Sequence, residues 1–313
     1  MQTVELDYEL PPELIAQRPL ERRDDARLLV HERATGVTRH SRFADLRAEL
    51  EPGDLVVVND TRVVPAKLHV ARPGGGAAEV LLLEPRGSGL WEALARPSRR
   101  LRPGMKLDGV ELVEYLGEGR WLVSLEGEPG GLPPLPPYIH EELDDPERYQ
   151  TVYADEPGSA AAPTAGLHFT AELLAGLDVE HVTLHVGLDT FRPVTEARLE
   201  EHALHGERYH VSPSAWERIR GAARVVAVGT TTVRVIETLA LGAPLEGRTE
   251  LFLTPGFEFR RVDSLVTNFH LPRSTLLALV MAFAGVGETR ELYRIAISER
   301  YRFYSFGDAM LIL

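Results

Sequence analysis

Arg224-Val-Val-Ala-Val228 and the residues directly after it, Gly229-Thr-Thr-Thr232, indicate the fold class of the chain. A short valine-rich run bounded by glycine predicts a buried strand. The glycine and the three hydroxyl residues then predict the start of a helix over 233–241. A strand that leads directly into a helix is typical of an α/β domain.

The elements around this pair extend the same pattern over the second half of the chain. His181-Val-Thr-Leu-His-Val186 alternates polar and apolar residues and predicts a strand. Ser212-Pro213 is typical of an N-cap followed by a first turn, and it predicts a helix to about residue 223. Short apolar runs at 251–253 and 264–266 predict two further strands.

A polar cluster precedes the most apolar helix that the sequence predicts. Val266-Thr-Asn-Phe-His-Leu-Pro-Arg-Ser-Thr275 leads into nine apolar residues, 276–284. Pro272 suits the first turn of this helix, because its φ is fixed and it has no N–H to leave unpaired. Asn268 and His270 then lie at the mouth of a buried helix, where unsatisfied polar groups are costly. We expect them to serve a function; a hydrogen-bonded core histidine is the alternative.

Short strand candidates follow one another between residues 55 and 125, at 55–58, 66–70, 79–83, 91–95, 110–113 and 120–125. Clusters of Gly, Pro and Asp separate them at roughly regular intervals, which is typical of an antiparallel barrel or sandwich. Residues 130–137 are too rich in proline for a helix or a central strand, so we interpret them as a stiff connection back to the first domain.

The predicted fold is therefore a main α/β domain with an inserted antiparallel β-barrel domain. The main domain is assigned to residues 1–60 and 150–313, and the insert to residues 61–149. In the first segment, Arg27-Leu-Leu-Val30 predicts a strand, and Ser41 predicts the N-cap of a helix that ends at Leu50.

Composition excludes several classes of protein. The 313 residues contain no cysteine, which excludes disulfides, thiolate zinc sites and cysteine nucleophiles. The first residues lack an apolar signal core, and the run at 276–284 is about half a membrane span. We therefore expect a cytoplasmic protein without a membrane partner.

Two clusters of arginine stand out in a chain whose net charge is −13. Because the average field repels nucleic acid, an RNA partner would require a local basic patch. Each cluster is either such a patch or a solvated surface. The first consists of Arg18, Arg22, Arg23 and Arg27, and the second of Arg96, Arg99, Arg100 and Arg102.

Two segments are candidates for ligand contact. At Gly229–Thr232, free N–H groups at a helix start, three hydroxyls and Arg234 would suit a carboxylate or a phosphate; plain helix capping is the alternative. In Ala160-Ala-Ala-Pro-Thr-Ala-Gly-Leu-His168, the small residues around Thr164 and Gly166 would let the backbone approach a ligand closely.

Histidines at two places raise the question of a metal. His181 and His185 share one face of the predicted strand, and His202 and His205 follow Glu201. Such groups can bind zinc together with a carboxylate, but no His-Glu-x-x-His pattern is present. We predict no metal site.

Long and unusual segments are distributed along nearly the whole chain. They are Tyr8-Glu-Leu-Pro-Pro-Glu-Leu-Ile-Ala-Gln-Arg-Pro19, Pro52-Gly-Asp-Leu-Val-Val-Val-Asn-Asp-Thr-Arg62, Pro136-Pro-Tyr-Ile139, Arg148-Tyr-Gln-Thr-Val-Tyr153, Ala161-Ala-Pro-Thr-Ala-Gly-Leu-His-Phe-Thr170, His185-Val-Gly187, Thr190-Phe-Arg-Pro-Val194, Gly229-Thr-Thr-Thr232, Val266-Thr-Asn-Phe-His-Leu-Pro272 and Tyr301-Arg-Phe-Tyr-Ser-Phe-Gly-Asp-Ala-Met310. Together they resemble the S-adenosylmethionine:tRNA ribosyltransferase-isomerases of queuosine biosynthesis.

The resemblance implies a reaction, its partners and a fold. The ribosyl group of S-adenosylmethionine moves onto 7-aminomethyl-7-deazaguanine at the tRNA wobble position and isomerises, which gives epoxyqueuosine and releases adenine and methionine. S-adenosylmethionine is then a substrate, no cofactor is implied, and we expect a monomer. The implied fold, an α/β domain with an inserted β-barrel, agrees with our interpretation of residues 61–149.

Three positions depart from the family pattern. Asp189 stands where glycine is usual before Thr-Phe, Ala26 where serine is usual before Arg-Leu, and His140 begins a His-Glu-Glu run where a basic residue is common. We expect the activity to survive these changes, although a carboxylate at 189 would either alter a ligand pocket or merely reshape a turn.

Given the implied reaction, candidate roles follow for the polar residues of these segments. The sulfonium acidifies the adjacent C5′ protons, and a neutral imidazole is a suitable base near pH 7. His168 and His270 are the favoured bases and His185 the third. Asp308 would orient one of them or hold ribose hydroxyls.

Binding roles are assigned in the same way. The helix start Gly229, Thr230 and Thr231, with Arg234, would hold the methionine carboxylate, and Thr267 or Asn268 would hydrogen-bond the adenine. Tyr138 or Tyr153 would stack on bases that flank the modified guanine. The loop that contains Arg96, Arg99 and Arg100 would bind tRNA phosphate.

Two other functions remain open from the residues alone. A metal-dependent hydrolase would use the histidine groups, and metal analysis of the purified protein would reveal it. A non-catalytic RNA-binding module would use the barrel and its basic loop, but it would have no use for the Pro-Thr-Ala-Gly-Leu-His and Asn-Phe-His-Leu-Pro segments.

Overall fold

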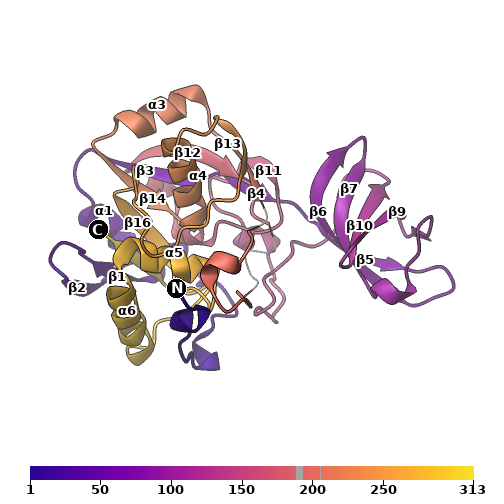
Figure 1. Ribbon diagram of the computed structural model, residues 1–313, viewed down its shortest axis with the longest axis horizontal. Helices are drawn as coiled ribbons and strands as arrows, with labels where there is room; N and C mark the ends of the chain where they lie inside the picture. Colours follow the sequence, from indigo (N-terminus) through magenta and orange to yellow (C-terminus); the bar gives the residue numbers. More distant parts are fainter. Residues whose placement is uncertain (188–192, 205) are drawn as a thin grey trace.

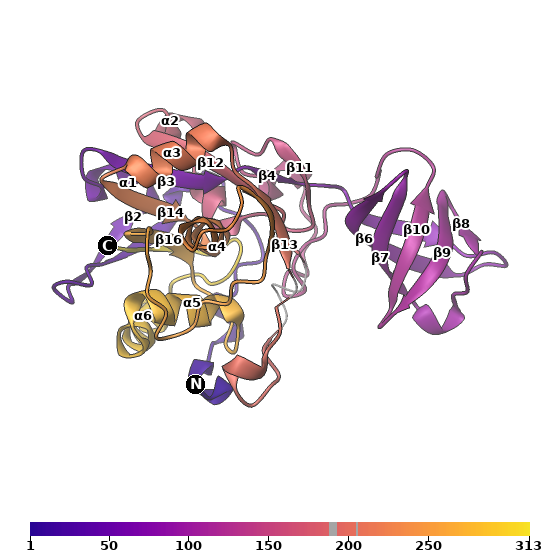
Figure 2. The same ribbon diagram turned by 45° about the horizontal axis from the view of Figure 1, so that its top comes forward.

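A large α/β domain and a smaller curled sheet make up the molecule, and two connecting segments join them (Figures 1 and 2). The computed structural model describes residues 1–187, 193–204 and 206–313. The predicted fold class, a main α/β domain with an inserted antiparallel barrel, is confirmed.

The main domain is built on a nine-stranded mixed sheet with the strand order β15-β13-β12-β3-β14-β16-β17-β1-β2. Its strands are β1 (Arg27–His31), β2 (Thr38–Arg42), β3 (Asp54–Asn59), β12 (Asp178–Leu184), β13 (Glu207–His210), β14 (Arg224–Val228), β15 (Glu246–Thr249), β16 (Ser264–Asn268) and β17 (Ala309–Ile312). The four adjacent strands β12, β3, β14 and β16 run parallel, and antiparallel pairs flank them.

Side chains alternate between the two faces along each strand, and the parallel strands carry apolar side chains on both faces. Helices therefore cover both faces. Leu55 and Val57 of β3 pack with one cluster, which includes residues of α3 (Pro213–Gly221), α4 (Thr230–Ala240), α5 (Thr275–Ala284) and α6 (Val286–Ser298). Val56 and Val58 face the other cluster, which includes residues of α1 (Leu46–Glu49) and α2 (Ala171–Leu174).

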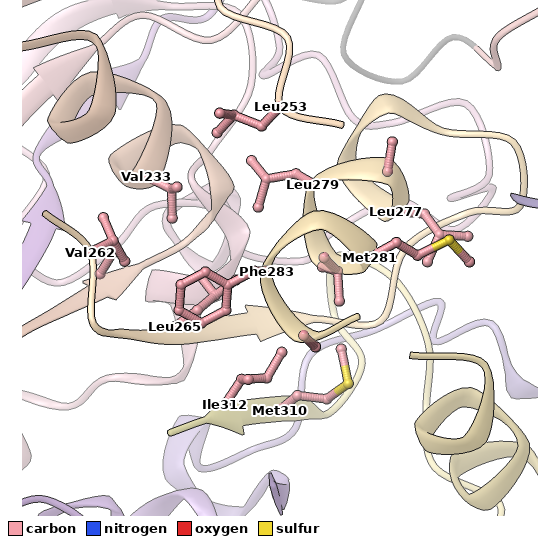
Figure 3. Packing of buried hydrophobic residues seen from close by; sticks show 14 of the residues in the cluster. Val233, Leu253, Val262, Leu265, Leu277, Leu279, Met281, Phe283, Met310 and Ile312 are labelled. Atoms are coloured by element: carbon pink, nitrogen blue, oxygen red, sulfur yellow. The ribbon is translucent and has the colours of Figure 1, made fainter. Parts of the chain in front are cut away.

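The apolar helix α5 packs over strands β16 and β17 of the main sheet (Figure 3). Figure 3 shows Phe283 close to Leu265 of β16, and Met310 and Ile312 of β17 below the helix. Because α5 is apolar on nearly all sides, it must be buried between the sheet and its neighbours. The end of β16 and the start of α5 are thereby held in place.

Short 3₁₀ helices connect many of these elements. They are η1 (Thr3–Leu6), η2 (Pro12–Leu14), η3 (Arg23–Asp25), η4 (Phe43–Asp45), η5 (Ser98–Arg100), η6 (Pro146–Tyr149), η7 (Thr164–His168) and η9 (Leu199–Glu201). No helix in the described part of the chain has the length and apolar character needed to cross a membrane.

The inserted domain is a six-stranded antiparallel sheet in the order β5-β6-β7-β10-β9-β8, curled into a nearly closed barrel. Its strands are β5 (Lys67–Ala71), β6 (Ala77–Gly87), β7 (Leu90–Arg96), β8 (Lys106–Leu107), β9 (Val110–Gly117) and β10 (Arg120–Leu125). Inward-facing residues form a separate core that includes Val80, Leu112 and Trp121. The predicted strands from 66 to 125 are thus confirmed, and only β8 was missed.

The two connections between the domains are themselves ordered. β4 (Thr61–Val63) pairs in parallel with β11 (Glu156–Ser159). Ile139 and Tyr149 pack with main-domain residues such as Phe306. The barrel strands lie inside the assigned insert 61–149, and the boundaries themselves remain a prediction.

Three local expectations were wrong. Ser41 does not cap a helix but lies in β2, where it is paired with Leu28. Residues 251–253 form a loop after β15, outside any strand. Pro272 precedes the first turn of α5, because Ser274 is the N-cap and accepts a hydrogen bond from the Leu277 N–H (3.1 Å).

Asn59 at the end of β3 joins the central strand to its neighbours. Its side-chain amide donates to the Leu184 carbonyl (3.0 Å) and its oxygen accepts from the Leu184 N–H (3.0 Å). The same oxygen accepts from the Thr61 N–H (3.2 Å), and the amide also reaches Thr231 Oγ1 (3.3 Å). The fully buried side chain therefore replaces a backbone pairing between β3 and β12 at the point where the chain leaves for the barrel.

We expect Asn59→Ala to lower the free energy of unfolding by several kcal/mol, because each buried backbone group left unpaired costs roughly 1–3 kcal/mol. Urea denaturation of both proteins measures the difference. Thr35→Ala, which removes a hydroxyl whose hydrogen bonds to Glu32 and Val37 are exposed to solvent, is the control and should stay within about 0.5 kcal/mol of the parent. An unfolding free energy in Asn59→Ala as high as in the control would contradict this account of the strand junction.

Candidate active site

Most of the predicted polar segments meet at one edge of the main sheet. Asn59, His185, Gly229 and Asn268 lie at or directly after the ends of the four parallel strands β3, β12, β14 and β16. Ligands of open α/β sheets bind outside the carboxyl ends of parallel strands. The sheet topology therefore brings together side chains that are up to about two hundred residues apart in the sequence.

A small cavity lies at this edge, and we call it the β16 cavity. It contains seven of the predicted site residues: Thr164, Gly229, Thr230, Thr231, Thr267, Asn268 and His270. Ala162, Pro163, Ala165, Val186 and Leu276 complete its wall. The structure therefore assembles the β14–α4 junction, the Pro163-Thr164 segment and the Asn268-Phe269-His270 segment around one space.

The start of α4 forms one wall of the β16 cavity. Gly229 has φ of +87°, a value that favours glycine, and its N–H donates to the Val266 carbonyl (2.8 Å). Thr232 bonds back to the Val228 carbonyl (2.7 Å), whereas Thr230 and Thr231 line the cavity. N–H groups in the first turn of a helix have no partner within it, so this wall attracts an anionic group.

His270 contributes an imidazole to the same cavity. Its Nε2 lies 2.8 Å from Thr267 Oγ1, and its backbone N–H donates to the Tyr293 hydroxyl (2.8 Å). Burial lowers the pKa of His270 to about 3, so the ring is neutral at pH 7. Neutral imidazole held in a fixed orientation is a competent proton acceptor.

His168 lies on the other side of Asn268. The Asn268 amide donates to His168 Nε2 (3.1 Å), while Asn268 Oδ1 accepts from the Thr164 hydroxyl (3.2 Å). The His168 ring packs against Phe43, with 4.9 Å between ring centroids. Burial, followed by the charges of Arg302 and Arg23, lowers its pKa to about 3. His168 therefore contacts the β16 cavity only through Asn268.

His185 lies in a larger space between the main domain and the barrel, which we call the interdomain cleft. The cleft is lined by Leu83, Glu84, Leu94 and Arg120 of the barrel and, among others, His185, Val186, Glu207, Arg208, Arg248 and Leu276 of the main domain. It adjoins the β16 cavity, since Val186 and Leu276 line both. His185 Nδ1 is 2.9 Å from Thr61 Oγ1, and burial lowers the His185 pKa to about 4.

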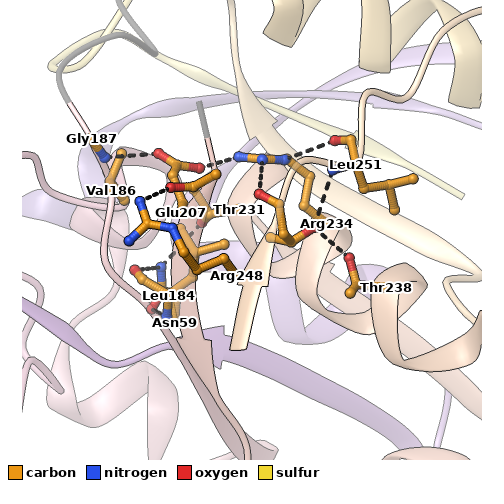
Figure 4. A network of polar contacts seen from close by, with 12 residues as sticks. Asn59, Leu184, Val186, Gly187, Glu207, Thr231, Arg234, Thr238, Arg248 and Leu251 are labelled. Atoms are coloured by element: carbon orange, nitrogen blue, oxygen red, sulfur yellow. Dashed lines mark hydrogen bonds and ion pairs between the residues drawn. The ribbon is translucent and has the colours of Figure 1, made fainter. Parts of the chain in front are cut away.

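Arg234 does not join the helix start in holding an anion. Its guanidinium forms a buried ion pair with Glu207 and donates to the carbonyls of Thr249 (3.1 Å) and Leu251 (3.1 Å), as Figure 4 shows. Glu207 also accepts from the Gly187 N–H (2.8 Å). Arg234 thus lines the interdomain cleft and links β13, β15 and α4, so the role assigned from the sequence is corrected.

Asp308 also has a different role from the one predicted. Its carboxylate accepts the backbone N–H groups of Arg27 (3.0 Å) and Arg302 (2.8 Å). These bonds fix the loop before β17 and leave none to a histidine side chain among the described residues. Asp308 lies within the segment Tyr301–Met310 on which the family resemblance rests, and its carboxylate serves to order that segment.

Gly166 and the two tyrosines lie outside the β16 cavity. A Cβ at Gly166 would lie 1.9 Å from the Tyr153 hydroxyl, so this glycine makes room for a phenol rather than for a ligand. Tyr153 packs edge-on against Phe169, and Tyr138 hydrogen-bonds Ser305 (2.8 Å) beside Tyr304. Both tyrosines are half-buried, and stacking of bases on Tyr138 or Tyr153 remains a prediction.

The arginines predicted to contact RNA belong to the inserted domain, whereas the β16 cavity is lined by residues of the main domain. Arg96, Arg99 and Arg100 are exposed around η5, on the inserted domain. Asp189 and His205 lie outside the described residues. Within the described chain, no group of three His, Asp or Glu side chains is arranged to hold a metal ion.

Sequence reasoning missed two contributors to the site. Asn59 was quoted only within the segment Pro52–Arg62, without a role, yet it supports Thr231 and the end of β12. Gly158 packs directly on the His185 ring, where a Cβ would lie 3.0 Å from Cε1. The signal for Asn59 was present, because a polar residue that ends a run of three valines is a candidate for a structural hydrogen bond.

Comparison with known proteins shows the family of the chain. The family described as queuosine biosynthesis protein matches residues 3–312. The chain belongs to this family. Relatives named S-adenosylmethionine:tRNA ribosyltransferase-isomerase include one from Rubrobacter xylanophilus, 56% identical over 328 residues with 100% of this chain and 98% of the relative covered. Another relative, from Symbiobacterium thermophilum, is 51% identical, and the match covers 100% of this chain and 100% of the relative.

A solved structure in the same family supports the fold. It is the crystal structure of S-adenosylmethionine tRNA ribosyltransferase from Thermotoga maritima, which is 40% identical with a TM-score of 0.57. The match covers 99% of this chain and 100% of that one. As a member of the queuosine biosynthesis family, the chain is an enzyme of the ribosyltransferase-isomerase class.

Replacing His270 by alanine should lower single-turnover rate by roughly 10²–10⁴-fold, because a positioned general base contributes about that much. His168→Ala should lower it less, since His168 acts on the cavity only through Asn268. Rapid-quench kinetics and melting temperature are measured together. The control is His210→Ala, on the exposed side of β13, which should keep the parent rate. A near-normal rate in His270→Ala would remove this residue as the base.

The buried histidines should also make stability depend on pH. The pKa values of His168 and His270 are about 3 in the folded protein and near 6.5 when unfolded, so below pH 6.5 the unfolded chain binds more protons. The folded protein therefore keeps its full stability above pH 6.5 and loses stability as the pH falls toward 3. Between pH 7 and pH 5, each of the two histidines should lower the free energy of unfolding by about 2 kcal/mol. Urea denaturation of His270→Gln should show a correspondingly shallower pH dependence, and an unchanged dependence would contradict a buried neutral ring.

Proposed function

We propose that this enzyme transfers the ribosyl group of S-adenosylmethionine to 7-aminomethyl-7-deazaguanine at the tRNA wobble position and isomerises it to give epoxyqueuosine-tRNA. The observation that carries the proposal is the β16 cavity, in which a neutral imidazole and an anion-attracting helix start face one space. S-adenosylmethionine requires both, since it has a carboxylate at one end and acidic C5′ protons beside its sulfonium.

In this proposal the α4 start binds the methionine carboxylate. The first-turn N–H groups of Thr230 and Thr231 supply donors, and the helix dipole adds favourable charge. Thr267 and Asn268 are placed to hydrogen-bond the adenine, although both already have partners in His270 and His168. Adenine binding at these residues would therefore rearrange the hydrogen bonds around both imidazoles.

His270 is the proposed base for a C5′ proton. It lines the β16 cavity directly, whereas His168 lies behind Asn268 and His185 lies in the interdomain cleft. As the reaction proceeds, the bonds from sulfur to C5′ and from adenine to C1′ break, and the aminomethyl nitrogen bonds to the rearranged ribosyl group. The C5′ proton and one proton of the amine are lost, adenine takes up one proton, and one proton is released together with methionine. The atoms balance without an oxidant or reductant, so we propose that no cofactor is required besides the two substrates.

The interdomain cleft is the proposed place of the modified guanine. It adjoins the β16 cavity and combines an apolar floor, with Leu251, Leu253 and Leu279, and arginines at its rim. Pockets for bases commonly combine apolar walls with a few polar groups. A base inserted between barrel and main domain would reach the ribosyl group across the wall that Val186 and Leu276 share.

We expect incubation with S-adenosylmethionine and tRNA that carries the aminomethyl-deazaguanine to yield equimolar adenine and methionine, without added metal or redox cofactor. A methyltransferase would instead leave S-adenosylhomocysteine. Chromatography of the small molecules measures all three, and a parallel reaction with chelator should give the same yield. Formation of S-adenosylhomocysteine, or no adenine with saturating modified tRNA, would sink the proposal.

The exposed arginines of the barrel are proposed to contact tRNA phosphates. In a chain of net charge −13, Arg96, Arg99 and Arg100 form a local positive field. Arg99→Ala with Arg100→Ala should weaken tRNA binding and flatten its dependence on salt, by about one unit of logarithmic slope per lost contact. Binding of S-adenosylmethionine should hardly change. An unaltered salt dependence would place this loop outside the RNA interface.

A further inference from the structure

A second cavity lies behind His168, and it is strongly basic. It is lined by three arginines, Arg23, Arg148 and Arg302, together with His168, Ser305 and other residues. The arginines come from three distant segments: η3, η6 and the loop before β17. Among the described residues that line it, none is Asp or Glu. We call it the arginine cavity.

Two of the three guanidinium groups are held by carbonyl oxygens rather than by carboxylates. Arg23 donates to the carbonyls of Gln150 (2.7 Å), Leu167 (3.2 Å) and Glu147 (3.1 Å). Arg148 donates to the carbonyl of Glu21 (3.0 Å) and to that of Leu20. Neutral acceptors orient a guanidinium without cancelling its charge, so both positive charges remain available to a ligand.

Several details show that this charge is not fully compensated within the described chain. The buried Nε of Arg148 has no hydrogen-bond partner there. Burial lowers the pKa of Arg23, and the charge of Arg148 lowers it further. Arg302 has a carboxylate nearby, but its Nε lies 3.5 Å from Asp308 Oδ1, and Asp308 already accepts two backbone N–H groups. The carboxylates of Asp145 and Glu147 partly offset the charge of Arg23, but among the described residues no carboxylate lines the space that the three cations face.

We propose that the arginine cavity binds a backbone phosphate of the RNA substrate next to the modified nucleotide. This inference rests on the proposed function, because it assumes that RNA reaches the site. Planar guanidinium groups match the oxygens of a phosphate in pairs, and arginine is favoured where such recognition matters. A phosphodiester supplies the anionic charge that this cavity lacks.

The surroundings favour RNA over the carboxylate of S-adenosylmethionine. The cavity lies across Asn268 and His168 from the α4 start, so the two anion sites are separate. Ser305 and Phe306 line it, and Ser305 hydrogen-bonds Tyr138, whose ring lies 4.7 Å from that of Tyr304. Basic groups beside aromatic rings are typical of sites for single-stranded nucleic acid.

The arrangement also connects RNA binding to the reaction. Arg23 and Arg302 both lower the pKa of His168, and His168 is hydrogen-bonded to Asn268 in the wall of the β16 cavity. A phosphate at the arginine cavity would neutralise these charges beside the ring. The bound RNA backbone would thus influence the hydrogen bonds that position the reacting groups.

Arg302→Gln tests the proposal, since the Arg302 side chain is partly exposed and makes only 3.5 Å contacts, so the fold should tolerate the change. Binding of an anticodon stem-loop RNA is titrated from about 50 to 200 mM salt, and binding of S-adenosylmethionine is titrated separately. The variant should bind the RNA several-fold more weakly, with a salt slope smaller by about one, and should bind S-adenosylmethionine as the parent does.

Two matched variants make the result decisive. Arg302→Lys keeps the charge and should retain most of the salt slope. Arg294→Gln removes an exposed arginine of α6, paired with Glu291, and should bind RNA as the parent does. An unchanged slope in Arg302→Gln would overturn the proposal, and so would a loss of S-adenosylmethionine affinity instead of RNA affinity. Binding is measured without turnover, so failure of the proposed reaction would appear separately, as a lack of adenine release by the parent enzyme.

Discussion

The hydrogen bonds of one buried amide, Asn59, determine how the rest of the structure is arranged. It closes the central strand β3 by bonding both backbone groups of Leu184, the last residue of β12. The pairing of β3 with β12 ends at this point, and the chain continues through β4 toward the barrel. The same amide reaches Thr231 at the α4 start, which ties the strand junction to the proposed anion site. Insertion of the barrel at the carboxyl edge of the sheet therefore places a second domain against the interdomain cleft, which adjoins the β16 cavity.

Burial of histidine in neutral form is the second constraint. His168 and His270 are both nearly inaccessible and titrate far below neutral pH, and each ring is held by a polar side chain of β16. Such an arrangement is unfavourable for a charged ring and favourable for a proton acceptor at pH 7. Asn268 bonds to His168 and Thr267 contacts His270, so two successive residues of one strand hold the two imidazoles. The proposed anion sites at the α4 start and in the arginine cavity are separate, because Asn268 lines one cavity and His168 the other.

The fold could be predicted from sequence where local pattern and packing agree. The Val225–Val228 run and the hydroxyls after Gly229 gave β14 and α4, and the evenly spaced short runs gave five of the six barrel strands. The family likeness, borne by long motifs, is confirmed by matches over the whole chain. Seven site residues do share one cavity, because the ends of parallel strands meet at one edge. Arg234 and Asp308 were misassigned because a sequence does not show which charge or backbone group a side chain will meet: Glu207 pairs with the first, and two backbone N–H groups bind the second.

A crystal structure with S-adenosylmethionine and a modified anticodon stem-loop tests the central claim most directly, which is that the β16 cavity holds the sulfonium substrate against a neutral histidine. The account predicts the methionine carboxylate within hydrogen-bond distance of the N–H groups of Thr230 and Thr231, and C5′ about 3–3.5 Å from a ring nitrogen of His270. A complex in which S-adenosylmethionine binds with its carboxylate in the arginine cavity, or with C5′ remote from His270, would contradict it.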